Sequence, residues 1–512
     1  MSDKRPWIRA VLLGVTTAAV AGAAVIAAVG SADAATVSHQ YFVDCAAGSD
    51  SNTGTEAGHA WKTLAKVASV TLGPGDVVGL RAGTTCTGTL APKGSGTVDN
   101  PVIIKTYSDG ALARIDGKGA RAAVFLHNVQ GYTIKNLEVT NTGATPGATE
   151  QRTGIYVLLE DFGTGSGYLV NNVNVHDVNG CDCRFPNASG GIIFEAGGST
   201  KPTGFACVTI KNSVVRHVDR SGIAIFSVWQ KRAGNPNGPG ASFVPMTDVN
   251  INTNTLSDLG GDGIGLVNGD NARVHDNVID GYNVRTGDYN LGLYAYNSDD
   301  TIFKNNQVLN GAGVGIAYGI EDANFGTLFE DNYSRNNAGG FMYICNADGS
   351  GGSGNTVRYN ISVGDGAPNP FLGLLTLPCA GAQQNMQVYN NSFYAPSSPA
   401  LIQNFGAAAV KWTNNIFYGQ AAGSTINDNL GTYDHNVFYR VSTLPANQTA
   451  SILADPHFVA ANVTAAAADL KLRAGSPAVG AGATVAYAGG QDYFGSPLSS
   501  PLNIGAYQGA GL

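Results

Sequence analysis

Apolar and polar residues alternate along the chain in a phrase that returns every 21 to 31 residues. Each copy contains an alternating segment that ends in Asn, a short β-branched segment, a polar loop and a segment that opens with Gly. Period-2 alternation puts successive side chains on opposite faces of a strand, so the pattern predicts short strands. The clearest copies end at Asn254, Asn277, Asn306, Asn332, Asn360, Asn391, Asn415 and Asn436.

The spacing of these asparagines predicts a solenoid. Their steps are 23, 29, 26, 28, 31, 24 and 21 residues, which is a near-constant core with loops of variable length. Strands about 4.8 Å apart would place Asn above Asn, so that each side-chain amide bonds to its neighbours. We therefore expect a structural asparagine ladder without a chemical role. More divergent copies carry Asn136, Asn172 and Asn212 one place earlier.

The Gly-led segments predict a second set of strands with one buried face. These segments span residues 191–195, 222–226, 263–267, 292–296, 315–321 and 340–344. Alternation predicts that one set of side chains points inward, namely Ile192, Ile223, Ile264, Leu293, Ile316 and Phe341. The opposite set would point outward, namely Glu195, Phe226, Tyr294, Tyr296 and Glu321.

From about residue 40 to its end, the sequence resembles right-handed parallel β-helix proteins of the pectate-lyase-like superfamily, in particular secreted bacterial β-helix-repeat proteins. Besides the repeats, the resemblance rests on the start at 41–54, an amphipathic segment at 60–67 and endings at 472–482 and 503–507. It implies an all-β fold, a single-stranded right-handed parallel β-helix with an N-terminal capping helix and a C-terminal cap. We expect a signal peptide at 1–34, an N-terminal cap with first rungs at 35–120, a central β-helix at 121–441, and C-terminal rungs with a cap at 442–512.

The start of the chain predicts export. Lys4, Arg5 and Arg9 precede an apolar run at 10–30 and the sequence Ala32-Asp33-Ala34, which has the form that signal peptidase cleaves. We expect cleavage before Ala35 and a secreted, extracellular protein. The alternative is an uncleaved anchor, because the run is long enough to span a bilayer.

Composition and net charge limit the classes of protein and of binding partner that we expect. Only 13% of the residues are charged, about half the usual share, while 43% are hydrophobic, which excludes a disordered polymer. The net charge of −8 leaves no basic face for nucleic acid. We expect no nucleic-acid partner, no membrane contact after cleavage and a monomer, because both ends of the β-helix would be capped.

Seven cysteines lie after residue 34, and export permits disulfides. Candidate pairs are Cys45 with Cys86, Cys345 with Cys379, and Cys207 with Cys181 or Cys183, although spacing does not fix connectivity. A zinc site is the competing interpretation, but the sequence has no Cys-x-x-Cys.

Three successive repeats carry the best candidates for chemistry. Asp262 precedes one strand, Asp288 precedes the next, and Glu321 with Asp322 ends the third. Two rungs would separate Asp262 from Glu321 by about 9 to 10 Å, near the upper end for the carboxylates of inverting glycosidases. Asp288 could instead join an acidic cluster that binds Ca²⁺. The alternative is a structural role, in which Asp262 caps a turn and Glu321 and Asp322 only keep the end of a strand hydrated.

Other residues are candidates for binding or for an elimination reaction. Tyr294 and Tyr296 would offer outward rings that stack on sugars. Trp229, which opens the long loop 229–247, and Lys231 are further predicted substrate-binding residues. A lyase needs a base and a group that neutralises a uronate, and the resemblance implies Ca²⁺ with a Lys or Arg base. Arg285 is the candidate cation beside Asp288, although arginine is a poor base.

These observations predict a secreted enzyme that cleaves an extracellular polysaccharide on the outer β-helix face. The resemblance favours pectate-lyase-like elimination, whereas the carboxylate spacing favours a glycoside hydrolase. The alternative from another class is a non-catalytic carbohydrate-binding or cell-surface β-helix, since long solenoids present extended binding surfaces.

Overall fold

A computed structural model describes residues 38–512, except residues 348, 367–370, 380 and 407. The expected signal peptide and its cleavage point lie outside the described residues. Residues 38–512 form one unit by their internal contacts. Among the described residues, no helix is long and apolar enough to cross a membrane.

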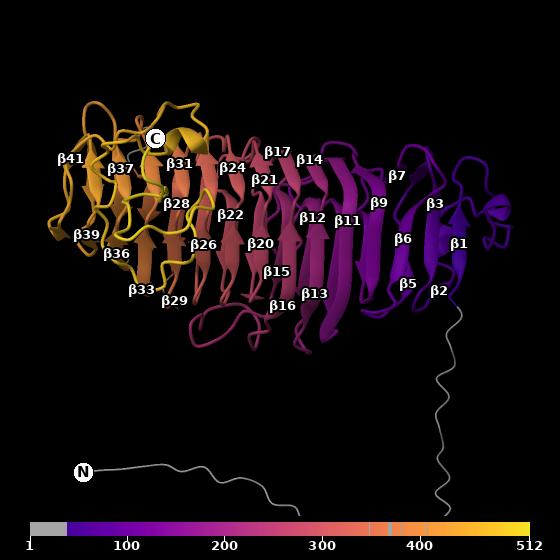
Figure 1. The fold of residues 1–512 in the computed structure, drawn as a ribbon. Coiled ribbons are helices and arrows are strands. Elements are labelled where there is room, and N and C mark those ends of the chain that lie inside the picture. Colours follow the sequence, from indigo (N-terminus) through magenta and orange to yellow (C-terminus); the bar gives the residue numbers. More distant parts are fainter. Residues whose placement is uncertain (1–37, 348, 367–370, 380, 407) are drawn as a thin grey trace, which may run out of the picture. The chain divides into compact units, whose positions relative to one another are not determined.

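The Gly-led strands form one parallel sheet, in which each strand pairs with its counterpart in the next repeat (Figure 1). We call it the site sheet. Its twelve strands, in spatial order, are β8 (Ala122–His127), β10 (Thr153–Glu160), β12 (Gly190–Gly197), β15 (Ser221–Ser227), β18 (Ile264–Val267), β22 (Leu291–Tyr296), β25 (Ile316–Glu321), β28 (Gly340–Cys345), β32 (Leu375–Leu377), β35 (Ala400–Asn404), β38 (Ser424–Asn427) and β41 (Val441–Thr443).

The alternating segments on both sides of the ladder form the remaining large sheet, which has 28 strands among the described residues and two parallel columns. The first column contains β1 (Gln40–Val43), β3 (Val77–Arg81), β6 (Val102–Tyr107), β9 (Tyr132–Asn141), β11 (Thr164–Val178), β13 (Gly204–Lys211), β16 (Met246–Asn252), β19 (Gly269–Asp270), β20 (Arg273–His275), β23 (Ile302–Lys304), β26 (Leu328–Glu330), β29 (Gly351–Ser353), β30 (Thr356–Arg358), β33 (Ala382–Tyr389), β36 (Ala408–Thr413), β39 (Thr432–Asp434) and β42 (Gln448–Thr449). The second column contains β4 (Thr85–Thr87), β7 (Ala113–Asp116), β14 (Val214–Val218), β17 (Thr255–Leu259), β21 (Val278–Asp280), β24 (Gln307–Leu309), β27 (Tyr333–Arg335), β31 (Ile361–Val363), β34 (Ser392–Tyr394), β37 (Ile416–Tyr418) and β40 (Val437–Tyr439). The long strands β9 and β11 run through both columns.

The predicted right-handed parallel β-helix is confirmed, and so is its asparagine ladder. The eight clearest ladder asparagines are buried, with exposed fractions of 0 to 1%. The Asn306 amide nitrogen donates to Asn332 Oδ1 at 3.0 Å and to the Val274 carbonyl at 2.9 Å. The Asn306 backbone N–H donates to the same Asn332 oxygen at 3.0 Å. Each ladder residue thus satisfies buried backbone groups where the chain turns between columns.

Alternation fails at one predicted core position. Ile192, Ile223, Ile264, Leu293 and Phe341 lie in the main core, as predicted. Ile316 instead packs with Leu291 and Tyr294 on the outer face of the site sheet. The reason is that the consecutive residues Ala317 and Tyr318 both enter the core, so the period of two breaks at the start of β25.

The first rung is closed by a short helix, as predicted. The helix α1 (Leu64–Val67) buries Leu64 and Val67 in the main core, and the Thr63 hydroxyl caps it by accepting from Lys66 N. The 3-10 turn η1 (Ala57–His59) and the two-stranded sheet of β2 (Thr71–Leu72) and β5 (Lys93–Gly94) lie in the same terminal region.

The last segment of the chain folds back along the β-helix, as the yellow ribbon near β31 shows (Figure 1). It includes the 3-10 turn η2 (Ala467–Leu470) and buries the apolar side chains of both predicted endings against the outer face of the second column. The Tyr333 hydroxyl donates to the Ala465 carbonyl at 2.6 Å, and Asn414 bonds to the Ala483 backbone.

Two of the candidate disulfides are present, Cys45–Cys86 and Cys345–Cys379. The third pairing was wrong, because Cys181 bonds to Cys183 two residues later and Cys207 is free. Cys207 lies on β13, on another face of the β-helix from the loop that carries the Cys181–Cys183 pair.

Candidate active site

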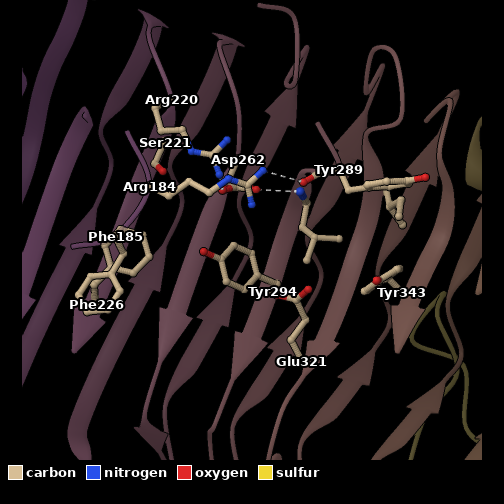
Figure 2. Close-up of a pocket in the computed structure, with 12 residues that line it drawn as sticks. Arg184, Phe185, Arg220, Ser221, Phe226, Asp262, Tyr289, Tyr294, Glu321 and Tyr343 are labelled. Carbon is tan, nitrogen blue, oxygen red and sulfur yellow. Dashed lines mark hydrogen bonds and ion pairs between the residues drawn. The ribbon is translucent and has the colours of Figure 1, made fainter. Parts of the chain in front are cut away.

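A cavity of about 310 Å³ lies on the outer face of the site sheet, over the starts of β15, β18, β22 and β25 (Figure 2). Its polar lining comes from the loop between β11 and β12, from residues at the starts of these strands, and from residues within or at the ends of strands. The lining residues are Arg184, Phe185, Arg220, Ser221, Phe226, Asp262, Tyr289, Leu291, Tyr294, Ile316, Glu321 and Tyr343. The predicted residues that the structure brings together here are Asp262, Tyr294 and Glu321.

Asp262 is a buried carboxylate held by a buried guanidinium. Its Oδ2 accepts from Arg220 Nη2 at 2.6 Å, and its Oδ1 accepts from the Leu291 backbone N–H at 2.9 Å. Arg220 also donates to Asn290 Oδ1 at 2.5 Å. Asp262 and Arg220 are 7% and 4% exposed, so each needs the charge of the other. The bond to Leu291 shows that Asp262 reaches from the start of β18 toward β22, one rung closer to Glu321.

Glu321 ends β25 and points into the cavity (Figure 2). In strand register it lies beside Tyr296 on one rung and Cys345 on the other. Among the described residues, no hydrogen bond or ion pair holds its carboxyl group. Burial by the surrounding side chains raises the pKa of Glu321 to about 8, and the charges of Asp262 and Asp322 add to the rise. The group is therefore mostly protonated at neutral pH.

Tyr294 separates these two carboxyl groups in the view of Figure 2. Its ring lies over Gly265 of the preceding rung, where an added Cβ would be 2.5 Å from the tyrosine hydroxyl oxygen. Only glycine leaves this room. Burial first, then the charges of Asp262 and Glu321, raise the pKa of Tyr294 well above its usual value, so the hydroxyl stays neutral.

Sequence reasoning missed the cations and several rings of this cavity. Arg184 and Phe185 come from the long loop between β11 and β12, and Phe185 packs on Phe226 with ring centroids 5.2 Å apart. Tyr289 precedes β22. Arg220 had a usable signal, because it lies two residues before the Gly-led segment at 222–226, close to the place that Asp262 holds before Gly263. For Arg184 and Phe185 the length of the loop at 180–190 was the signal, but the path of that loop is not encoded in the repeat pattern.

Three predicted catalytic residues lie outside the lining. Asp288 is 68% exposed and pairs with Arg184 at 3.2 Å. Asp322 is buried, accepts from Ser350 Oγ at 2.7 Å and from the Ala347 backbone N–H, and so fixes a turn. Arg285 binds two carboxylates, Asp219 and Asp258, at 2.6 and 2.5 Å. Because these two carboxylates hold its guanidinium outside the cavity lining, it is not placed to act as a base there.

The predicted binding residues divide in the same way. Tyr296 lines a neighbouring cavity together with Tyr294. Trp229 was wrong as a binding residue, because it is 1% exposed, lies in the main core and donates to the Gly197 carbonyl at 2.9 Å. A tryptophan that anchors a loop in the core cannot be told from an exposed one by its place in the sequence. Lys231 is exposed and lines neither cavity.

The acidic residues that the structure describes are not clustered as a cation site would require. Within the described part of the chain, no group of three or more His, Cys, Asp and Glu residues is arranged to hold a metal ion. Asp262 is neutralised by Arg220, and Asp288 points to solvent with Arg184. The residues present therefore do not fit the Ca²⁺ that the resemblance implied, and we derive no step through a metal.

The arrangement can perform general acid chemistry. It holds a protonated carboxyl group and a carboxylate paired with arginine in one cavity, with an aromatic ring between them. Pairs of carboxyl groups with different environments serve as proton donor and as base, nucleophile or charge stabiliser.

Comparison with known proteins supports the fold. Residues 203–368 match the family described as "Right handed beta helix region". A crystal structure of the GH136 lacto-N-biosidase from Eubacterium ramulus superposes with a TM-score of 0.63 and 21% identity, covering 76% of this chain and 68% of that one. The complex of XylC with xylose gives a TM-score of 0.56 and 12% identity over 92% of this chain and 98% of that one. The chain is a right-handed parallel β-helix protein.

One relative is also similar in sequence. The lacto-N-biosidase of Bifidobacterium longum subsp. longum is 28% identical over 513 aligned positions, which cover 81% of this chain and 31% of the relative. The chain thus spans about a third of the length of this curated relative. The resemblance to pectate-lyase-like β-helix proteins is confirmed at the level of the fold.

Proposed function

We propose that the chain is a glycoside hydrolase whose proton donor is Glu321 and whose second carboxylate is Asp262. The observation that carries the proposal is a carboxyl group with a pKa raised to about 8 in a cavity that also holds an arginine-paired carboxylate. A donor that keeps its proton at neutral pH is what cleavage of a glycosidic bond requires.

In the proposed reaction, the Glu321 carboxyl gives its proton to the glycosidic oxygen while the bond from that oxygen to the anomeric carbon breaks. The positive charge that develops on the sugar ring faces the Asp262 carboxylate. Either Asp262 attacks the anomeric carbon and water later releases the sugar, or Asp262 takes a proton from an attacking water. The first route retains the anomeric configuration and the second inverts it.

The comparisons support hydrolysis better than the elimination that the sequence resemblance favoured. The similar proteins with the stronger matches are named as lacto-N-biosidases, which are hydrolases. In addition, Arg285, the cation proposed as a lyase base, is paired away from the cavity. We therefore propose a carbohydrate substrate and hydrolysis. From the sequence we also propose that the protein is secreted and acts as a monomer.

The size of the cavity bears on the mode of action. At about 310 Å³ it lies at the lower end of ligand pockets and is bounded by the Arg184 loop on one side. Such a pocket suits one terminal sugar unit or a short glycan better than the interior of a long polymer. We propose cleavage from a chain end or from a small glycoside.

The test is a panel of glycosides that includes a lacto-N-bioside and a xyloside, with released sugar and ultraviolet absorbance read in parallel. Hydrolysis predicts new reducing ends without an unsaturated product. Glu321→Gln and Asp262→Asn should each lower kcat about 10²-fold or more. Glu160→Gln is the matched control, since Glu160 is an exposed carboxylate at the end of β10 on the same sheet.

Two results would contradict the proposal. Products that absorb in the ultraviolet would mean elimination. Binding of glycans without any turnover, by the wild type as well as by both carboxyl variants, would mean a carbohydrate-binding protein.

A further inference from the structure

A second cavity, of about 460 Å³, adjoins the first on the outer face of the site sheet. Phe185, Phe226, Tyr294 and Glu321 line both cavities, so the proposed proton donor lies where they meet. We call the second cavity the apolar chamber. Its other lining residues are Pro186, Val228, Gln230, Pro239, Val267 and Tyr296.

The apolar chamber offers few free hydrogen-bonding groups. Its valines and prolines have none in their side chains. The Gln230 amide donates to the Ser227 carbonyl at 2.6 Å. Tyr296 also lines the chamber, and burial first, then the charge of Asp322, raise the pKa of its hydroxyl above the usual value, so that the side chain stays neutral. A sugar bound here would leave hydroxyl groups without partners, which costs far more than leaving apolar surface unpaired.

The first cavity has the opposite character. Arg184, Arg220 and Asp262 give it charged hydrogen-bonding groups that suit the hydroxyls of a sugar. A proton donor for glycoside cleavage must reach the bond between the sugar and its leaving group. Because Glu321 borders both cavities, the sugar fits the charged one and the leaving group fits the apolar one.

The wall of the apolar chamber is built before any ligand arrives. The loop that carries Val228, Gln230 and Pro239 is anchored by Trp229 in the core. Arg232 of the same loop bonds to Asp299 at 2.6 Å and to Asn297 at 2.7 Å. A wall held in this way needs no ordering on binding, which favours affinity for a rigid apolar group.

We propose that the apolar chamber receives the leaving group and that the preferred substrates are glycosides of an apolar alcohol, with a ring favoured by the aromatic lining. This inference rests on the proposed function, since it assigns the other half of the same substrate.

The test compares three glycosides that share the sugar found active in the panel and differ in the leaving group. The leaving groups are 2-phenylethanol, n-octanol and glucose, and each departs as a neutral alcohol because Glu321 protonates the glycosidic oxygen as the bond breaks. We expect kcat/KM for the phenylethyl glycoside to exceed that for the glucose-terminated substrate at least tenfold, with the octyl glycoside also above it. Equal or better cleavage of the glucose-terminated substrate would overturn the inference and leave the proposed function intact.

A variant adds a readout within the chamber. Val228 is partly exposed and also packs against the main core, so urea unfolding of Val228→Asn is measured beside its activity to show that the variant is folded. It should lower kcat/KM for the phenylethyl glycoside about tenfold, a larger loss than for the glucose-terminated substrate. Val463→Asn, at a valine that is 52% exposed in the C-terminal segment, is the matched control. An equal loss on all three substrates would overturn the assignment.

Binding separates this inference from the failure of catalysis. Saturation-transfer NMR with 2-phenylethanol should show binding to the wild-type protein and to Glu321→Gln, and weaker binding to Val228→Asn. That pattern in a protein without turnover would reject the proposed function and keep an apolar binding site. Absence of phenylethanol binding would reject the chamber itself.

Discussion

Replacing Glu321 by Gln should stabilise the folded protein at alkaline pH while it removes activity. The carboxyl group is surrounded by protein and lies near Asp262 and Asp322, so the folded chain resists its ionisation and its pKa rises from 4.5 to about 8. Between these two values the folded chain binds more protons than the unfolded chain. Its stability therefore falls as the pH rises through this window.

The size of the effect follows from the same shift. One pKa unit of difference between the folded and unfolded chain corresponds to about 1.36 kcal/mol, so the full difference amounts to about 5 kcal/mol. This is an upper value, because part of the side chain faces the water of the cavity, which screens the charge. We expect Glu321→Gln to raise the free energy of unfolding by about 2–4 kcal/mol at pH 9, relative to the wild type.

Urea unfolding at pH 5 and pH 9, followed by intrinsic fluorescence, measures this difference. At pH 5 the glutamate is protonated in the folded state, so the wild type and Glu321→Gln should differ by less than about 1 kcal/mol. Glu160→Gln should change neither value beyond that range. The reasoning would be refuted by a Glu321→Gln effect that is the same at both pH values, or by a loss of stability at pH 9.

Three further predictions concern the scaffold and the positioning of the site. Asn332→Ala should lower the free energy of unfolding by about 2–6 kcal/mol in urea titrations. The reason is that the Asn306 backbone N–H and the Phe303 carbonyl, both buried, would lose the hydrogen bonds that they form with this side chain. Replacing Cys345 and Cys379 together by Ser should cost about 3–4 kcal/mol in the same assay, since the disulfide closes a loop of 34 residues. Gly265→Ala should lower kcat/KM ten- to a hundredfold, because the added methyl group displaces the Tyr294 ring from the cavity.

Each of these three variants has a control measurement that would show if the stated reason is wrong. Gln307→Ala, at an exposed position on β24, should change stability by less than about 0.5 kcal/mol. For the disulfide, a wild-type sample treated with reductant should lose at least as much stability, since all three disulfides are then open, and no loss in either sample would contradict the loop argument. Gly287→Ala has no atom within 4 Å of its added Cβ, so equal loss of activity there would count against displacement of Tyr294.

The fold was predictable because a solenoid repeats its constraints. Eight asparagines at nearly constant spacing fix the strand register, and one buried face fixes which side chains turn inward. The single inward prediction that failed, Ile316, lies where two consecutive residues enter the core. Such a local break in alternation depends on how the neighbouring strands pack, so the sequence of one strand does not reveal it.

The site was predictable only where strands supply it. Asp262, Tyr294 and Glu321 lie on or next to strands, so repeat position predicted that they face one cavity. Arg184 and Trp229 lie in long loops, and the path of a loop is set by contacts far away in sequence. For this reason the core contact of Trp229 and the cavity contact of Arg184 could not be predicted from the sequence.

The pH dependence of kcat/KM for the best glycoside in the panel tests the central claim most directly. A proton donor acts only while protonated, so the proposal predicts full activity below a pH of about 8 on the alkaline side and a tenfold fall for each further pH unit. Glu321→Gln should lack this limb and retain at most about 1% of the rate. Activity that stays constant or rises between pH 7 and 10, with Glu321→Gln still active, would contradict the assignment of Glu321 as the acid.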